Sequence, residues 1–314
     1  MKQLVLIIAL AGLLLAGCAS NGPSGPTNAQ TFLGGTDALV FAFDVGSPPD
    51  QVMKTEAFAV LLQVENKGEH NLEEGQLRME LKGFNAADFG KSRDDLIQYN
   101  EDPIGGAKLD PVSGERIGED NIFVTYENLA YQTSIAGPAT LPFYVDFCYA
   151  YQTLASGKLC IKEKLQGSTN TDVCTLTGAK DVASSSGPVS VTSLEEYVAG
   201  ADKIRFSFYV KNLGEGKVYD VDNLGTDWCE ETYTVEDYVH VTVDTHLTNE
   251  PVCAKLQSSN EGRVRFTSEG QVQISCIQDL TDEELTDQVK LVDITIDYLY
   301  SDHIEKQVTV IPEA

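Results

Sequence analysis

The chain has 314 residues, of which 42% are hydrophobic and 22% are charged, so it can form a hydrophobic core of normal composition. Its 48 acidic residues outnumber the 22 basic ones, and the formal net charge is -26. Such a surface repels phosphate backbones and anionic head groups, which argues against a nucleic-acid-binding protein. The length suits about two domains of ordinary size.

The start of the chain has the features of a secretory signal. Lys2 precedes an apolar stretch, residues 4–15, that is too short to cross a bilayer. The sequence Leu15-Ala16-Gly17-Cys18 then resembles the lipobox of prokaryotic lipoproteins. That resemblance implies cleavage before Cys18 and a diacylglycerol on its sulfur; the alternative is an ordinary signal that contains a cysteine. We expect a signal peptide at 1–17, a lipidated Cys18 with a flexible tether at 18–34, and an extracytoplasmic protein anchored to the cell membrane.

Alternating apolar and polar residues predict short strands along the rest of the chain. Residues 85–120 are polar and rich in glycine and proline, and we expect an extended loop there. Residues 281–284 have the pattern of a single capped helical turn. The expected strands are 57–65, 76–84, 121–126, 141–151, 158–164, 203–212, 237–246, 252–256, 263–267, 271–277 and 289–300.

The two halves of the chain carry the same pattern. KTEAFAVLLQVENKG and GADKIRFSFYVKNLG align without a gap, which puts Asn66-x-Gly68 on Asn212-x-Gly214. FYVDFCYAYQTLASGKLCI and ITIDYLYSDHIEKQVTVI each predict an aromatic-rich strand, a polar turn and a return strand. We therefore expect an all-β chain of two Ig-like antiparallel β-sandwich domains in tandem. Their ranges are 35–166 and 189–314, with a linker at 167–188.

The order of an apolar strand, N-x-G and a second strand resembles the Ig-like modules of the CARDB type, which occur in tandem on prokaryotic surface proteins. The stretches GGTDALVFAFDVGSPPDQVMKTEAFAVLLQVENKGEHN and FCYAYQTLASGKLCI are also similar to uncharacterised exported lipoproteins of small-genome archaea. The resemblance implies a fold and a place outside the membrane. It implies no catalytic residues.

Six cysteines remain beyond Cys18, and an even number in an exported chain predicts disulfides. Their spacing contains no C-x-x-C pair, so a structural zinc site is not expected. Many pairings are possible, and some of the cysteines could instead be free buried thiols. The pairing that we expect is Cys148 with Cys160 across the first hairpin, Cys253 with Cys276, and Cys174 with Cys229.

Residues 220–231 match part of the spacing of an EF-hand calcium loop. Asp220, Asp222, Gly225 and Glu231 fall at the first, third, sixth and last positions of that spacing. Leu224, however, takes a position that requires an oxygen ligand, and no helices are expected on either side. A calcium site on Asp220, Asp222 and Glu231 therefore competes with a plain acidic loop.

No nucleophile elbow, phosphate loop or distinct carboxylate pair is recognisable, so we expect no enzyme, no cofactor and no metal. His240 and His246 share a strand face at about 20 Å, which is too far for one metal ion. Trp228, the only tryptophan, and Tyr99 are the candidates for contact with a partner. We expect a structural or adhesive protein that is held to the membrane by its lipid and binds an envelope or surface protein. The alternative is an accessory subunit that captures a ligand or cation for an envelope complex.

Overall fold

The computed structural model describes residues 32–110, 112–167, 172–225, 228–229 and 236–313. Over these residues the chain is almost entirely β, as the sequence predicts, and its only helical elements are the single 3-10 turns η1 (Ala86–Phe89), η2 (Asp94–Leu96) and η3 (Val221–Asn223). The strands are β1 (Leu39–Phe43), β2 (Gln51–Met53), β3 (Phe58–Asn66), β4 (Leu77–Lys82), β5 (Ile97–Tyr99), β6 (Lys108–Leu109), β7 (Arg116–Ile117), β8 (Asn121–Leu129), β9 (Ala139–Ile161), β10 (Gly178–Lys180), β11 (Val182–Ser184), β12 (Val189–Val198), β13 (Lys203–Asn212), β14 (Lys217–Tyr219), β15 (Tyr238–Asp244), β16 (Val252–Ala254), β17 (Glu261–Arg265), β18 (Gln271–Asp279) and β19 (Gln288–Ile311).

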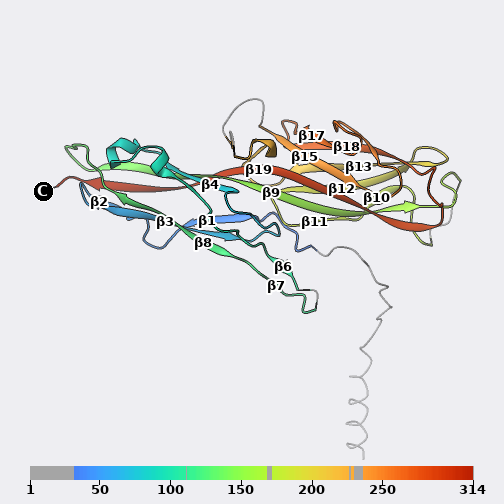
Figure 1. The fold of residues 1–314 in the computed structure, drawn as a ribbon, viewed down its shortest axis with the longest axis horizontal. Coiled ribbons are helices and arrows are strands. Elements are labelled where there is room, and N and C mark those ends of the chain that lie inside the picture. Colours follow the sequence, from blue (N-terminus) through green and yellow to red (C-terminus); the bar gives the residue numbers. More distant parts are fainter. Residues whose placement is uncertain (1–31, 111, 168–171, 226–227, 230–235, 314) are drawn as a thin grey trace, which may run out of the picture. The chain divides into compact units, whose positions relative to one another are not determined.

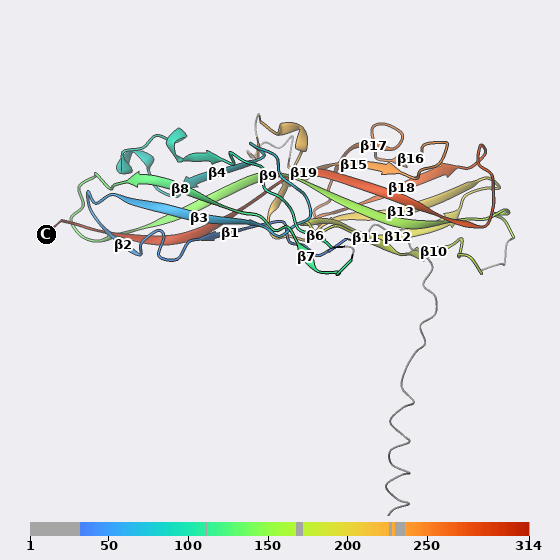
Figure 2. The same cartoon turned by 60° about the horizontal axis from the view of Figure 1, so that its bottom comes forward.

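Two long strands organise the fold. β9 pairs antiparallel with β19 over its whole length, from Ala139 opposite Val310 to Ile161 opposite Gln288. Figures 1 and 2 show them side by side, in green and red, through both halves of the described chain. The two hairpins expected in these segments are therefore wrong, because each strand continues straight through its expected turn.

The residues of the first expected turn are held in the sheet by specific contacts. The Gln152 amide donates to Asp297 at 2.8 Å, and the Thr153 hydroxyl lies 3.0 Å from the hydroxyl of Tyr298. Gly157 lies so close to the second sheet that a Cβ there would meet the Leu194 side chain at 2.4 Å. Small residues in QTLASG thus allow close packing of two sheets, where the sequence pattern suggested a turn.

Each half is a sandwich of two sheets, and the two sandwiches share β9 and β19. In the first, the sheet β1-β3-β8 faces β5, β4, β2 and the adjoining parts of β9 and β19; in the second, the sheet β10-β12-β13-β18-β16 faces β11, β15, β17 and the remaining parts. Every pairing is antiparallel except that of β2 with β19, among the strands described.

The shared strands cross the expected domain ranges. Residues 302–310, expected in the second domain, pair with residues 139–147 of the first sandwich. The expected linker at 167–188 supplies β10 and β11, which pair with β12 and β9. Thr31–Ala314 accordingly forms one compact unit, with one hydrophobic core cluster that runs through both sandwiches.

The Asn-x-Gly motif of the first half closes the loop after β3. The Asn66 side-chain oxygen accepts from Gly68 N at 3.1 Å, and its amide donates to the carbonyl of His70 at 2.8 Å. The hydroxyl of Tyr151, on β9, lies over this loop and accepts from His70 N at 3.5 Å. Gly68 has no side chain where the tyrosine hydroxyl sits, which explains why the motif needs glycine there.

The second half repeats this arrangement with a tyrosine from the other long strand. The Asn212 side chain accepts from Gly214 N at 3.1 Å and donates to the carbonyl of Gly216 at 2.9 Å. The hydroxyl of Tyr300, on β19, accepts from Gly216 N at 2.7 Å. The internal repeat predicted from the sequence therefore has a direct structural meaning: two equivalent loops, each closed by a tyrosine of a shared strand.

Two local expectations were wrong. The segment 85–120 is not one extended loop, because it holds η1, η2, β5, β6 and β7. Residues 281–284 form no helical turn; the chain makes a hydrogen-bonded turn in which Glu283 N donates to the carbonyl of Leu280.

The six cysteines form three disulfides: Cys148–Cys229, Cys160–Cys174 and Cys253–Cys276. The last agrees with the expected pairing, since Cys253 and Cys276 are opposite each other on β16 and β18. The other two expected pairs are wrong. Cys148 and Cys160 lie on the same continuous strand, about 40 Å apart at the rise of a β-strand, and each bonds to a loop instead.

Candidate functional site at the junction of the two sandwiches

Tyr99 and Trp228, the two candidates for partner contact, lie against each other. Tyr99 ends β5 in the first sandwich, and Trp228 follows η3 in the second half of the chain. Their ring centroids are 5.7 Å apart, with an interplanar angle of 47°. Tyr99 is 44% exposed and Trp228 only 7%. Trp228 is thus mainly packed against its neighbours, whereas Tyr99 is accessible at the surface.

Trp228 covers an apolar cluster on the outer face of the β9–β19 pair. The cluster comprises Cys148 and Ala150 of β9, Leu299 of β19 and Tyr219 of β14. Next to Trp228, Cys229 forms the disulfide with Cys148. This bond fixes a loop of the second half onto β9 beside the residues where β9 pairs with β4 of the first sandwich.

A cavity of about 560 Å³ lies beside this loop. Its floor is the outer face of β4, β9 and β19, where Arg78, Cys148 and Ser301 occupy one cross-strand row. The next row brings Glu80 beside Asp146. The lining is largely charged and carries both signs, and its strands belong to both sandwiches.

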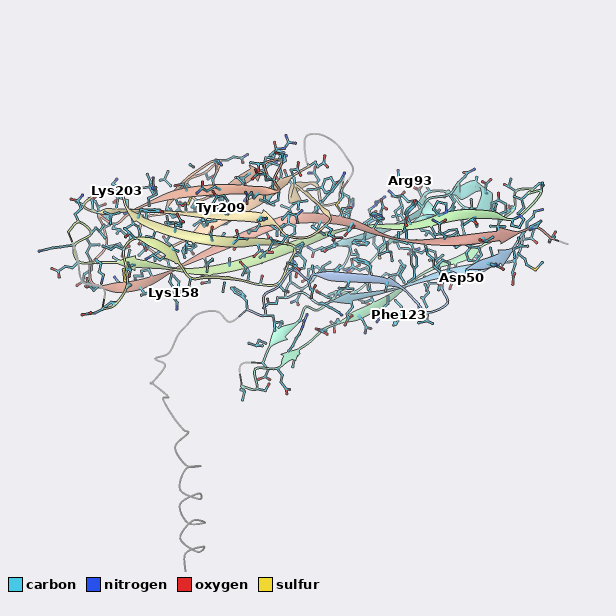
Figure 3. All side chains as sticks on the ribbon, turned by 180° about the vertical axis from the view of Figure 1, so that it is seen from behind. Asp50, Arg93, Phe123, Lys158, Lys203 and Tyr209 are labelled. Atoms are coloured by element: carbon cyan, nitrogen blue, oxygen red, sulfur yellow. A yellow bond between two sulfur atoms is a disulfide. The ribbon has the colours of Figure 1, made fainter. Side chains whose placement is uncertain are left out.

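Glu80 organises the charges at one wall of the cavity. Its Oε1 accepts from Arg93 Nε at 2.7 Å, and its Oε2 accepts from Arg78 Nη2 at 2.7 Å. Burial by itself would raise the pKa of Glu80, but the hydrogen bonds from Arg93 and Arg78 outweigh it and lower the pKa below its ordinary value. Glu80 is therefore ionised at neutral pH. The Arg93 side chain is 63% exposed at this wall (Figure 3).

Sequence reasoning missed Arg78, Glu80 and Arg93 as site residues. The alternation in QLRMELK could have placed Arg78, Glu80 and Lys82 on one outward face, because a strand with a buried face carries its charges on the other. Nothing in the sequence indicated that Arg93, at the start of η2, would reach back to that face.

Of the residues in the calcium hypothesis, Asp220 has a side chain that is engaged with other groups. Asp220 is 2% exposed, forms an ion pair with Arg263 and accepts from Asp222 N at 3.2 Å. Glu231 lies outside the described residues. Within the described ranges, no group of three His, Cys, Asp or Glu side chains could hold a metal ion. His246, from the histidine pair, contacts Asp293 at 2.7 Å and is half-exposed.

Cys18 and the expected signal peptide also lie outside the described residues. In the portion that is described, no helix has both the length and the apolar character needed to cross a membrane. The three disulfides are typical of proteins that fold outside the cytoplasm.

No protein-family model matches the chain, and no curated protein matches it. Among solved structures, the chain is similar to the partial N-terminal region of the enterococcal surface protein. The sequence identity is 9% and the TM-score 0.17, over 89% of this chain and 88% of that chain. With a sequence identity and a TM-score this low, no function can be inferred from that structure. The function is therefore argued from the residues of this chain.

Proposed function

We propose that the chain is a lipid-anchored, extracytoplasmic surface protein with a structural or adhesive role, which binds a protein partner and has no catalytic activity. The lipobox-like Leu15-Ala16-Gly17-Cys18 supports the anchor. The disulfides support an oxidising compartment. The net charge of -26 favours partners other than nucleic acid.

The observation that carries the proposal is the junction where Tyr99 lies against Trp228, beside the Cys148–Cys229 disulfide. Tyr99 and Arg93 are exposed beside the cavity, next to strands that the β9–β19 ladder and the Cys148–Cys229 bond hold in place. Tyrosine and arginine are enriched among the residues that dominate protein–protein binding energies. A surface that is already ordered loses little entropy on binding. Such a surface suits a binding module presented outside the membrane.

A second candidate function is the capture of a small ligand for an envelope complex. The observation that favours it is the cavity, whose volume of about 560 Å³ lies in the range of small-molecule sites. Arg78, Lys82 and Asp146 supply charges of both signs to its lining. This function predicts a small molecule that remains bound in native mass spectrometry of the purified protein.

We expect a fatty-acid label fed to cells that produce the chain to appear on the wild-type protein. The Cys18→Ser variant is expected to lose the label and to leave the membrane fraction, because the acyl chains supply the membrane affinity. Ser20→Ala, in the same tether, is the matched control and should keep both. A membrane-bound, labelled Cys18→Ser protein would contradict the anchor.

We expect a photoreactive phenylalanine analogue at position 99 to cross-link a defined envelope protein on intact cells. The same analogue at Tyr209, on β13 of the second sandwich (Figure 3), is expected to give no such product. Arg93→Glu should reduce the product from position 99, since Arg93 flanks the same surface. Equal products from both positions, or none from position 99, would contradict the proposed interface.

A further inference from the structure

Lys180 and Glu196 form a buried pair far from the residues of the junction site. Lys180 ends β10, the last strand of its sheet among the described residues, and Glu196 lies on the neighbouring β12. The Lys180 side chain is 10% exposed and Glu196 is fully buried. Lys180 Nζ lies 2.9 Å from Glu196 Oε2. The carboxyl carbon, which is bonded to Oε2, is therefore also close to the amine nitrogen.

The two oxygens of Glu196 differ in their surroundings. Oε2 accepts from the backbone N–H of Cys160 at 2.9 Å as well as contacting Lys180. Oε1 is buried and has no hydrogen-bond partner among the residues that the structure describes. An ionised carboxylate with one unpartnered buried oxygen is costly. Burial accordingly raises the pKa of Glu196, although the hydrogen bond from Lys180 acts in the opposite direction.

We propose that Lys180 and Glu196 are joined by an intramolecular amide bond, which forms spontaneously in the folded chain. A proton passes from the ammonium to the carboxylate, which leaves a neutral amine and a carboxylic acid. The Nζ lone pair then attacks the Glu196 carboxyl carbon, a C–N bond forms, and the bond from that carbon to Oε1 breaks. Oε1 leaves as water with two of the three ammonium hydrogens, so no other reactant is needed.

The surroundings of the pair favour this reaction. The Cys160 N–H points at Oε2, where negative charge develops in the tetrahedral intermediate, and a fixed donor at that position lowers the barrier. Lys180 Nζ also donates to the carbonyl of Thr175, which holds the amine at the carboxyl group. Positioning of this kind turns an improbable encounter into an intramolecular step.

The other buried lysine of this region faces a carboxylate that is more exposed. Lys162 is 1% exposed and lies 3.2 Å from Asp287, but the Asp287 side chain is 30% exposed. The backbone N–H of Glu163 donates to Asp287 and lowers its pKa, so this carboxylate stays ionised and resists attack. Lys162 therefore serves as an internal control, a buried lysine that is not expected to form an amide bond.

The amide would tie the sheet-edge strand β10 to β12, close to the Cys160–Cys174 disulfide. Edge strands are the elements of a sheet most exposed to fraying and to unwanted pairing. A covalent bond at this edge would make the chain more resistant to unfolding. This property is independent of the proposed function in surface binding.

The test is a tryptic peptide map of the reduced and alkylated full-length protein. Trypsin does not cut after an amidated lysine, so we expect a peptide of residues 165–203, uncut at Lys180 and lighter than its sequence mass by one water. Fragmentation should place the bond between Lys180 and Glu196. A succinimide elsewhere would also cost one water, but it would leave Lys180 open to trypsin.

Lys180→Arg preserves the positive charge and cannot form the amide. It should give the peptides 165–180 and 181–203 at their full masses, while Lys162→Arg should leave the 165–203 product unchanged. Recovery of 165–180 and 181–203 at full mass from wild-type protein with all three disulfides formed would overturn the proposal. The peptide map of the wild-type protein is sufficient to test the proposed amide bond. The test therefore does not depend on whether the Lys180→Arg variant folds.

Discussion

Replacing Gly68 by alanine is expected to lower the free energy of unfolding by about 3 kcal/mol, a large effect for one added methyl group. The new Cβ would lie 1.8 Å from the Tyr151 hydroxyl oxygen, 2.9 Å from the ring carbon that bears it and 3.0 Å from the Ala38 Cα. The tyrosine cannot move aside easily, because it is buried and its hydroxyl donates to the carbonyl of Ser186 at 2.9 Å. Urea unfolding at fixed temperature measures the change.

The second half offers an independent copy of this experiment. At Gly214 a Cβ would lie 2.1 Å from the Tyr300 hydroxyl, so Gly214→Ala should destabilise the fold by a similar amount. Gly137 is the matched control, because a Cβ there meets nothing within 4 Å. If Gly68→Ala and Gly137→Ala gave equal stabilities, the close approach of the tyrosine would not be the reason for the motif.

A double-mutant cycle separates this clash from a general intolerance of alanine. Tyr151→Phe alone removes the hydrogen bonds of the hydroxyl and should cost about 1 kcal/mol. Combined with Gly68→Ala, it also removes the closest clash, so the double variant should be more stable than the sum of the two changes predicts. Strict additivity would show that the hydroxyl and the glycine do not interact.

The Asn-x-Gly repeat was visible in the sequence because it is local: both residues and the strand before them lie within a short window. The pattern predicted the β3 and β13 strands and the correspondence of the two halves. It did not reveal the tyrosines that complete each loop, since Tyr151 and Tyr300 come from distant parts of the chain. A short-range pattern identifies the loop, and only the tertiary fold identifies what covers it.

The two long strands illustrate the opposite case. QTLASG and SDH read as turns because small and polar residues favour turns in isolation. In the structure, Thr153 pairs with Ile296 and Ser301 with Cys148 across β9 and β19, and Gly157 admits the close approach of Leu194. The polar residues did not mark a turn here, because the side chains of Gln152 and Thr153 have partners on β19, Asp297 and Tyr298. Because we expected a hairpin in this segment, we also expected Cys148 to pair with Cys160 across it, and both expectations are wrong.

The candidate site was predictable only in part for the same reason. The sequence suggested Trp228 and Tyr99 separately as candidates for partner contact. It could not show that they contact each other, because they lie on a loop and an edge strand that are distant in sequence. Glu80 and Arg78 belong to a regular alternation, and their functional interest arises from Arg93, which no periodicity connects to them.

Removal of the Cys148–Cys229 disulfide is expected to have the largest effect on the chain. The bond closes a segment with a sequence separation of 81, and chain entropy assigns such a loop about 4 kcal/mol of stability. We therefore expect the Cys148→Ala/Cys229→Ala variant to lose about this amount in urea unfolding. Circular dichroism should still show the β content of the wild type, because the β9–β19 ladder does not depend on this bond.

The single tryptophan makes the local consequence measurable. Trp228 neighbours Cys229 and packs on Ala150 and Leu299 with 7% of its surface exposed. Without the disulfide, the contacts of Trp228 that remain among the described residues are that packing, its contact with Tyr99 and the hydrogen bond from Trp228 N to the carbonyl of Asn223. We expect the emission of Trp228 to shift to the red in the folded variant, with increased quenching by acrylamide.

The Cys253–Cys276 disulfide provides the matched control, since it closes a segment with a sequence separation of 23 and lies in the β16–β18 pair, away from the tryptophan. Its removal should cost about 3 kcal/mol by the same entropy argument while leaving the native tryptophan emission unchanged. The two variants thus share a loss of stability and differ in the signal from the junction. If the tryptophan emission responded to both or to neither, the Cys148–Cys229 bond would have no special part in holding the loop, and the rigid surface on which partner binding is proposed would lose its main support.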